Sequence, residues 1–200
     1  MENSVTVILV LVVFLFLWII AISTIWFFSS NTNFSKIKEN VKKRFNQKKI
    51  TEQERENFIF NLAETLVRLS DKKTGALIIY EQRNSLSIYE DSGFKMESKF
   101  DIEFVIAVFS NKKASFHDGA LIVSNANIKA ISCYVPITKE SNYSKHGARH
   151  RAALGISEIT DSISFVVSET TGNISFAKKG ELNSLGKTRE EIDENLKRLI

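Results

Sequence analysis

Cysteine and proline are almost absent from this sequence of 200 residues, which contains one of each, Cys133 and Pro136. A single thiol excludes an intramolecular disulfide framework and a zinc cluster built from cysteines. Eight glycines are too few for a low-complexity chain, and no internal repeat is visible. At 22.7 kDa, the chain is long enough for one ordinary domain and an appendage.

Charged residues are scarce at the N-terminus and unevenly placed elsewhere. Residues 1–28 carry one charge, whereas residues 36–49 carry seven basic residues and one acidic residue. The whole chain has 27 basic and 23 acidic residues, of which 20 basic and 21 acidic residues follow position 49. The net charge of +4 and the pI near 9.1 therefore arise from the short basic segment. Because nucleic-acid-binding domains usually spread positive charge over the folded surface, we expect no nucleic-acid partner.

Residues 5–28 form a long apolar run without any charge. As a helix with a rise of about 1.5 Å per residue, the run is roughly 36 Å long and can cross a hydrocarbon core of about 30 Å. A cleaved signal peptide is less favoured, because it would have a basic N-terminal region and a shorter apolar core. We therefore predict that residues 1–28 are a single transmembrane anchor, inserted in the lipid bilayer through residues 5–28.

The basic residues lie on the C-terminal side of the apolar run, and the N-terminal side has none. The positive-inside rule then places residues 29–200 in the cytoplasm of a protein that crosses the cell membrane once. Residues 29–50 are predicted to be a basic juxtamembrane linker to a domain over residues 51–200. The linker could bind anionic lipid, or it could act as a topology signal alone.

Four segments of the predicted domain have the apolar spacing or the start signals of helices, namely 52–72, 99–110, 149–160 and 189–199. Thr51 and Thr188 precede the first and the last of these segments. Each threonine has a glutamate three residues later, which is the spacing of a capping box.

Short apolar runs bounded by turn residues predict strands at 76–81, 120–124, 128–137, 162–168 and 173–177, with a possible further strand at 86–89. Residues 125–127 suit a hairpin turn, because asparagine tolerates a positive φ. Strands and helices alternate along the chain, and hairpins are antiparallel pairs. We therefore predict an α/β domain with a central mixed β-sheet flanked by helices.

Residues 180–188, GELNSLGKT, look like the phosphate-binding loop of NTPases. That loop needs four residues between its glycines so that backbone N–H groups wrap the phosphates, and here five residues separate Gly180 from Gly186. We therefore do not predict phosphate binding here, and interpret Gly186 and Thr188 as the turn and cap before the last helix.

The segment FHDGALIV at 116–123 contains residues suited to metal and hydroxyl chemistry. His117 and Asp118 can bind a divalent cation or polarise a hydroxyl group. Gly119 lets a ligand approach the backbone closely. Taken alone, the segment also fits an ordinary loop that enters a strand.

The segment HGARHRAALGISE at 146–158 contains two arginines that flank His150. Arg149 and Arg151 fall in the first turn of a predicted helix, where free N–H groups already favour anions, and two guanidinium groups there would clamp a phosphate. This segment alone also fits an exposed helix start. A metal-competent carboxylate and a basic clamp together are what phosphoryl or nucleotidyl transfer requires.

Four sequence blocks in the predicted domain are TGALI at 74–78, HDGA at 117–120, GARHRAALGISE at 147–158 and SETTG at 168–172. In order and spacing they resemble the signature of the diadenylate cyclase domain family, and the resemblance covers residues 50–180. The single N-terminal anchor further resembles a short, membrane-anchored branch of that family found in mycoplasmas.

The resemblance implies an enzyme that condenses two ATP molecules into cyclic di-AMP and releases two pyrophosphates. In that family each subunit holds one ATP, and two subunits meet face to face so that each 3′-hydroxyl attacks the partner's α-phosphate. The resemblance therefore implies a homodimer that is needed for catalysis. It also implies a divalent metal, Mn²⁺ or Mg²⁺. Regulatory protein partners are not indicated.

The resemblance implies a role for each matching residue. Asp118 would activate the 3′-hydroxyl with the metal, and His117 and Glu169 would help to hold that metal. Gly119, Arg149, His150 and Arg151 would complete the catalytic group, the last three by binding phosphates. The nucleotide would be bound by Gly119, Ala120, Tyr134, Val135, Arg149, Arg151, Ser168 and Glu169.

Two residues depart from the family's common pattern. Ala148 stands where a threonine is common, and the lost hydroxyl would weaken phosphate binding by about 1 kcal/mol. Thr170 stands where a second glutamate often follows the Ser-Glu pair, which leaves the preferred metal open. The alternative function is a non-catalytic membrane-tethered receptor for ATP or a cyclic dinucleotide. A Ser-His-Asp hydrolase is less favoured, because no serine lies on a nucleophile elbow.

Overall fold

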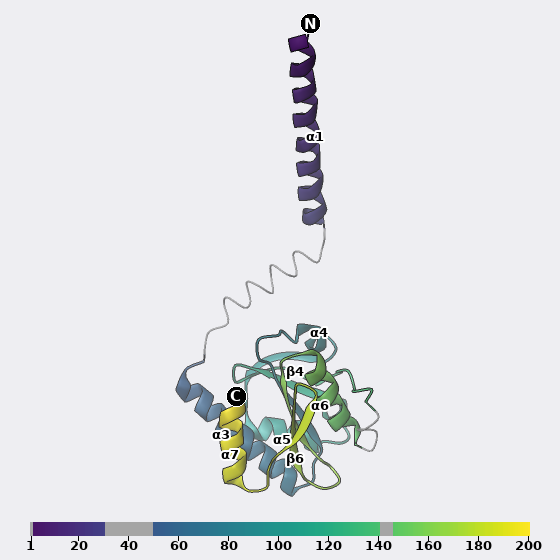
Figure 1. The fold of residues 1–200 in the computed structure, drawn as a ribbon. Coiled ribbons are helices and arrows are strands. Elements are labelled where there is room, and N and C mark those ends of the chain that lie inside the picture. The colour runs from purple at the N-terminus through teal and green to yellow at the C-terminus, as the bar shows by residue number, and fades with distance from the viewer. Residues whose placement is uncertain (1, 31–49, 141–145) are drawn as a thin grey trace. The chain divides into compact units, whose positions relative to one another are not determined.

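A computed structural model describes residues 2–30, 50–140 and 146–200 of the protein. The chain divides into two compact units, Met1–Lys48 and Lys49–Ile200. Figure 1 shows the helix of the first unit and the packed helices and strands of the second. The predicted linker over residues 29–50 lies almost entirely outside the described residues.

Helix α1 spans Glu2–Ser30 and contains the predicted membrane anchor. Within the described parts of the chain, its segment Val5–Trp26 is the helix that is long and apolar enough to cross a membrane. The hydroxyl groups of Ser23 and Thr24 donate to the carbonyl oxygens of Ile20 and Ala21, both at 2.9 Å. The helix thus satisfies these polar groups internally, as a lipid environment requires.

The second unit consists of alternating strands and helices. In chain order they are α3 (Glu52–Asp71), β1 (Ala76–Tyr80), α4 (Ser87–Glu90), β2 (Phe94–Lys99), α5 (Ile102–Ser110), the 3₁₀ turn η1 (Ser115–His117), β3 (Ala120–Ser124), β4 (Asn127–Cys133), α6 (Ala148–Ile159), β5 (Ile163–Val167), β6 (Ile174–Lys178), β7 (Glu181–Gly186) and α7 (Arg189–Leu199).

The strands form one seven-stranded sheet in the order β2-β4-β3-β1-β5-β6-β7. Strands β1 and β3 are parallel, whereas each other neighbouring pair is antiparallel. The predicted α/β domain with a mixed sheet is therefore confirmed. The predicted hairpin turn is confirmed as well, with positive φ values of 48° at Asn125 and 62° at Ala126.

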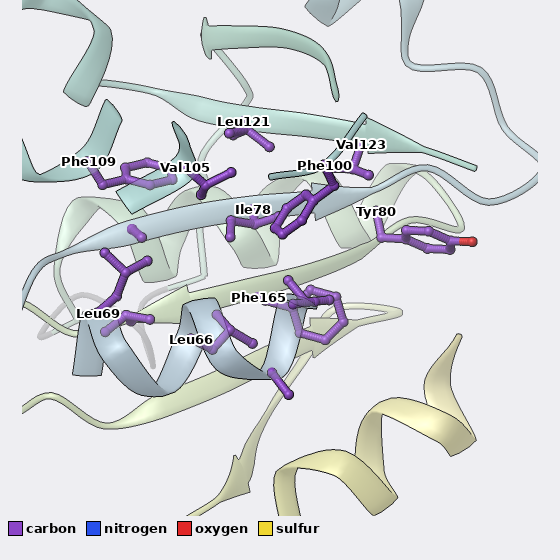
Figure 2. Close-up of a cluster of buried hydrophobic side chains, with 14 of the residues drawn as sticks. Leu66, Leu69, Ile78, Tyr80, Phe100, Val105, Phe109, Leu121, Val123 and Phe165 are labelled. Carbon is purple, nitrogen blue, oxygen red and sulfur yellow. The ribbon is translucent and has the colours of Figure 1, made fainter. Parts of the chain in front are cut away.

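The central strand β1 is buried along its whole length, because helices cover both faces of the sheet. Ile78 and Tyr80 belong to a core cluster that includes apolar residues of α3, α5 and α7. Figure 2 shows side chains of α3 and α5 gathered around Ile78. On the opposite face, Leu77 and Ile79 belong to a second cluster with apolar residues of α6. Successive side chains of a strand point to opposite faces, so one strand supplies both cores.

Side-chain caps fix where three of the helices begin. Thr51 and Thr188 each form the predicted capping box, with Glu54 and Glu191 respectively. Helix α5 begins at Ile102 rather than near residue 99, because the Asp101 carboxylate accepts a hydrogen bond from the N–H of Phe104 at 2.8 Å. A short side chain that satisfies a free N–H of the first turn determines the start of the helix.

The predicted strand at 86–89 is wrong, since Ser87–Glu90 forms the short helix α4. The buried carboxylate of Glu81 accepts a hydrogen bond from the N–H of Leu86 at 2.7 Å and bends the chain before this helix. The predicted strand at 128–137 ends at Cys133. A short apolar run by itself does not distinguish strand from helix, nor does it show where the strand ends.

Strands β2 and β7 were not predicted from the sequence. They lie at the two ends of the sheet order, where one side of each strand lacks a neighbour. Most of their side chains are exposed, as the sequence FKMESK of β2 illustrates. Exposed edge strands tolerate charged residues and need no apolar run, so the sequence pattern does not mark them.

Helix α6 approaches the chain after β4 very closely at Gly155, and this contact yields a prediction. A Cβ atom at Gly155 would lie 2.4 Å from the carbonyl oxygen of Pro136. We expect Gly155→Ala to destabilise the protein by about 1–3 kcal/mol, because helix and backbone must move apart. A urea midpoint in detergent micelles equal to that of the wild-type protein would contradict this packing account.

Candidate active site

The register of four strands brings the sequence blocks to one end of the sheet. Ala76 at the start of β1 lies opposite Val167 at the end of β5. Strand β3 runs parallel to β1, and its first residue, Ala120, lies opposite Cys133 at the end of β4. The segments that precede β1 and β3 and those that follow β4 and β5 therefore meet at the same end of the sheet.

The segment before β3 forms a tight loop in which Gly119 is required. Gly119 has a φ of +89°, and a Cβ atom there would lie 2.8 Å from the carbonyl oxygen of Cys133. Any other residue would be strained and would collide with the end of β4. The neighbouring Asp118 side chain is 71% exposed. The loop thus presents a carboxylate to solvent on a rigid backbone.

The His117 side chain is fixed by the backbone of the same loop. Its Nδ1 lies 2.6 Å from the carbonyl oxygen of Ala114, and its Nε2 lies 3.4 Å from Oδ1 of Asp118. A carbonyl oxygen only accepts hydrogen bonds, so Nδ1 carries the proton of that contact. In the neutral ring, Nε2 then offers its lone pair toward the carboxylate, an arrangement suited to a shared cation.

Arg149 connects three of the sequence blocks. It lies in the first turn of α6, and its guanidinium group donates to Oε2 of Glu169 at 3.0 Å and to the carbonyl oxygen of His117 at 3.3 Å. Its Nε is buried and has no hydrogen-bond partner among the described residues. One cation therefore holds the loop before β3 and the turn after β5 together, and keeps one donor unsatisfied.

Gly75, immediately before β1, makes room for this ion pair. A Cβ atom at Gly75 would lie 2.8 Å from Nη1 of Arg149 and 2.9 Å from Oε2 of Glu169. The sequence singles out the TGALI block only through its resemblance to a family, and the steric reason for the glycine comes from the structure. With Gly75 included, the four blocks meet in one place.

His150 and Arg151 follow Arg149 in the first turn of α6, and both are half-buried. Burial lowers the pKa of His150, and the neighbouring His146, whose ring centre lies 5.8 Å away, lowers this pKa further. His150 is therefore a neutral hydrogen-bonding group at pH 7. The carbonyl of Arg151 accepts from the N–H of Thr138 at 2.9 Å, which ties the helix start to the chain after β4.

Ser168 and Glu169 begin the turn that follows β5. The N–H groups of Thr171 and Gly172 are bonded to the hydroxyl and the carbonyl of Ser168, at 3.3 and 2.9 Å. The hydroxyl of Ser70 in α3 donates to the carbonyl oxygen of Gly172 at 2.5 Å. The turn is thus anchored to a core helix, while the Glu169 side chain stays 59% exposed.

Tyr134 and Val135 follow the end of β4, as the register requires. The Tyr134 side chain is exposed, whereas Val135 packs partly against the second core cluster, which also contains the buried Ala120. The N–H of Tyr134 donates to the hydroxyl of Ser92 at 2.9 Å. No sequence pattern marks Ser92, which lies in a turn between α4 and the unpredicted strand β2.

Of the three residues predicted to bind metal, two lie next to each other, and the third lies across Arg149 from them. Within the described ranges no group of three or more His, Cys, Asp or Glu side chains is placed to hold a metal ion. His117 and Asp118 lie together, and Glu169 is linked to them through Arg149. The carboxylate oxygens of Asp118 and Glu169 suit Mg²⁺ or Mn²⁺, and phosphate oxygens commonly complete such a set.

Comparison with known proteins agrees with the arrangement of these blocks. Residues 63–182 match the DAC family, described as the nucleotide-binding domain of the bacterial checkpoint controller DisA. A diadenylate cyclase of Mycoplasma genitalium is 40% identical over 163 residues, which cover 82% of this chain and 76% of that protein. One of Mycoplasma pneumoniae is 40% identical over 152 residues, covering 76% and 74%.

A solved structure of DacA from Staphylococcus aureus, a double mutant, has the same fold. It superimposes with a TM-score of 0.69 at 34% sequence identity, over 74% of this chain and 97% of that one. From the sequence blocks, the sheet and these relatives together, the chain belongs to the DAC family of diadenylate cyclase domains.

Proposed function

We propose that this protein is a membrane-anchored diadenylate cyclase, with an anchor over residues 1–28, a linker over 29–50 and a catalytic domain over 51–200. The observation that carries the proposal is the contact of Arg149 with both Glu169 and the His117 carbonyl. This contact gathers a carboxylate loop, a cationic helix start and an acidic turn at one end of a sheet. Relatives at 40% identity are named for this activity.

The proposed reaction joins two ATP molecules through two equivalent steps. In each step the 3′-oxygen of one ATP forms a bond to the α-phosphorus of the other, and the bond to the β-phosphate breaks. Pyrophosphate leaves, and the hydroxyl proton passes to a base. Two such steps convert two ATP into cyclic di-AMP and two pyrophosphates. The protein supplies mainly alignment and neutralisation of charge.

Asp118 is proposed to activate the 3′-hydroxyl together with a divalent metal. Its exposed carboxylate can reach a bound ligand, and His117 and Glu169 supply further donors. When bound, Mg²⁺ or Mn²⁺ would increase the acidity of the hydroxyl and neutralise phosphate charge. Diadenylate cyclases are metal-dependent in general, and the protein side chains leave the choice between the two ions open.

The triphosphate is proposed to bind at the start of α6. Arg149 and Arg151 supply positive charge, and neutral His150 supplies a hydrogen bond. Free N–H groups of the first helical turn point in the same direction as the helix dipole and favour an anion. Glu169 is the ion-pair partner of Arg149 at 3.0 Å, and a metal-bound triphosphate would replace this carboxylate with phosphate oxygens.

The adenosine part is proposed to lie against the ends of β3 and β4. The backbone at Gly119 and Ala120 would contact the nucleotide, and Ser168 would hold it from the turn after β5. The exposed ring of Tyr134 offers a face on which adenine can stack, and Val135 offers a backbone contact. Such contacts explain nucleotide binding, whereas the preference for adenine is carried over from the family.

Two copies of the protein are proposed to meet face to face. The 3′-hydroxyl and the α-phosphate of one ATP cannot react with each other to form cyclic di-AMP. Each active centre must therefore be completed by the nucleotide of a partner copy, toward which the exposed Asp118 would face. Residues 5–28 would hold both copies in the cell membrane, with the catalytic domains in the cytoplasm where ATP is available.

The first prediction from the proposed function tests the reaction and its carboxylate. We expect the full chain in detergent micelles to produce cyclic di-AMP from ATP with Mn²⁺ or Mg²⁺, as measured by mass spectrometry. Asp118→Asn should lower the rate about 100-fold or more, because the activating carboxylate is lost. Asp101→Asn is the matched control, since asparagine is an equally good helix cap. Tight ATP binding without any product would instead support the receptor function.

The second prediction concerns Gly75. Gly75→Ala should lower the rate of cyclic di-AMP formation roughly 10- to 100-fold, because the added methyl group displaces Arg149 and Glu169 by a fraction of an ångström or more. The melting temperature should change little, since the two nearest atoms are the ends of flexible side chains and the Glu169 Cβ, at 3.0 Å, needs to move by only a small distance. The Asp101→Asn variant, whose substitution lies outside the proposed site, should retain activity. Full activity of Gly75→Ala would refute the proposed role of the ion pair.

The third prediction concerns the homodimer. If each reaction needs two subunits, the specific activity of the detergent-solubilised protein should fall as it is diluted below the dimer dissociation constant. Light scattering over the same concentrations should show the monomer appearing in parallel. A specific activity that stays constant while the protein becomes monomeric would exclude the face-to-face arrangement.

A further inference from the structure

Ser92 lies in the turn between α4 and β2, and its hydroxyl contacts three backbone groups. It donates to the carbonyl oxygen of Tyr89 at 2.6 Å, with the carbonyl oxygen of Tyr134 as a longer alternative acceptor at 3.4 Å, and accepts from the N–H of Tyr134 at 2.9 Å. A hydroxyl group can do both at once. Because β4 ends at Cys133, the Ser92 hydroxyl, and not a neighbouring strand, accepts the hydrogen bond from the Tyr134 N–H.

The turn that carries Ser92 is pressed closely against the end of β4. A Cβ atom at Gly93 would lie 2.4 Å from the carbonyl oxygen of Ile131 and 2.7 Å from Sγ of Cys133. On the other side, the Ser132 hydroxyl donates to the carbonyl oxygen of Ser115 at 3.1 Å. The end of β4 is therefore held between the Ser92 turn and the loop that bears His117 and Asp118.

The loop between β1 and α4, which precedes Ser92, is held in place by hydrogen bonds to two carboxylates. The buried Glu81 carboxylate accepts a hydrogen bond from the N–H of Leu86 at 2.7 Å, at the start of α4. The Asp161 carboxylate accepts from the N–H groups of Arg83 and Asn84, at 3.3 and 2.9 Å. Two carboxylates thus anchor the preceding loop to the body of the domain, so that Ser92 extends from an anchored segment.

We propose that Ser92 is a positioning residue for the nucleotide base, which acts by fixing the backbone of Tyr134 and Val135. The inference rests on the proposed function, in which these two residues contact adenine. The Tyr134 side chain is 73% exposed, so packing does not hold it in place. Without the Ser92 hydroxyl that accepts from the Tyr134 N–H, the stacking surface would shift while Asp118 and Arg149 stay in position.

Steady-state kinetics of the full chain in detergent micelles tests this role. We expect Ser92→Ala to raise KM for ATP about fivefold, the equivalent of one lost hydrogen bond, and to leave kcat within about twofold. Ser92→Thr should restore the wild-type KM, because the hydroxyl is retained and the exposed site accommodates a methyl group. Ser85→Ala is the matched control before α4, since within the described residues the Ser85 hydroxyl accepts a hydrogen bond only from the nearby N–H of Ser87, at 3.4 Å.

An unchanged KM in Ser92→Ala would overturn the proposal, as would a Ser92→Thr variant no better than the alanine variant. A fall in kcat with an unchanged KM would also overturn it. The α,β-methylene analogue of ATP, which resists cleavage, gives a readout independent of turnover. Weaker binding of this analogue by Ser92→Ala in calorimetry would support the positioning role even if the wild-type protein formed no cyclic di-AMP. Failure of the wild-type protein to form cyclic di-AMP would refute the proposed function and not the positioning role.

Discussion

The candidate site depends on one guanidinium group. Arg149 reaches from the first turn of α6 to Glu169 and to the carbonyl oxygen of His117, and so ties a helix start to two loops from different strands. The side chain is 22% exposed, and water screens its ion pair less than it would on an open surface. The same group that organises the site is suited to bind phosphate. Its present partner, Glu169, is suited to bind the metal that accompanies that phosphate.

The sheet explains why these groups meet. The parallel alignment of β1 and β3, with antiparallel neighbours on both sides, brings two strand starts and two strand ends to one end of the sheet. Glycines then permit the close contacts, at Gly75 beside the ion pair and at Gly119 against β4. The domain is almost neutral, so its positive charge at the site is local, and the pI near 9.1 reflects the basic segment at residues 36–49.

The sequence predicted the buried parts of this architecture better than the exposed ones. Strands such as Ala76–Tyr80 and Ala120–Ser124 are continuous apolar runs, and the caps at Thr51 and Thr188 mark helix starts directly. The edge strands β2 and β7 have no such pattern. Helix α4 follows a hydrogen bond from the N–H of Leu86 to the nearby Glu81 carboxylate, and apolar periodicity does not reveal such a contact. Site residues in HDGA and RHR were identifiable from their chemistry. Gly75 and Ser92 were not, because their importance comes from contacts between segments far apart in the chain.

A crystal structure of the protein with the α,β-methylene analogue of ATP and Mn²⁺ tests the central claim most directly. We expect the triphosphate at the start of α6, with the Arg149 guanidinium group bound to phosphate oxygens instead of Glu169. The base should lie on Tyr134, and Asp118 and Glu169 should face the metal. A nucleotide bound away from the loops before β1 and β3 and the turn after β5, or bound there with the Arg149–Glu169 contact unchanged, would contradict the account.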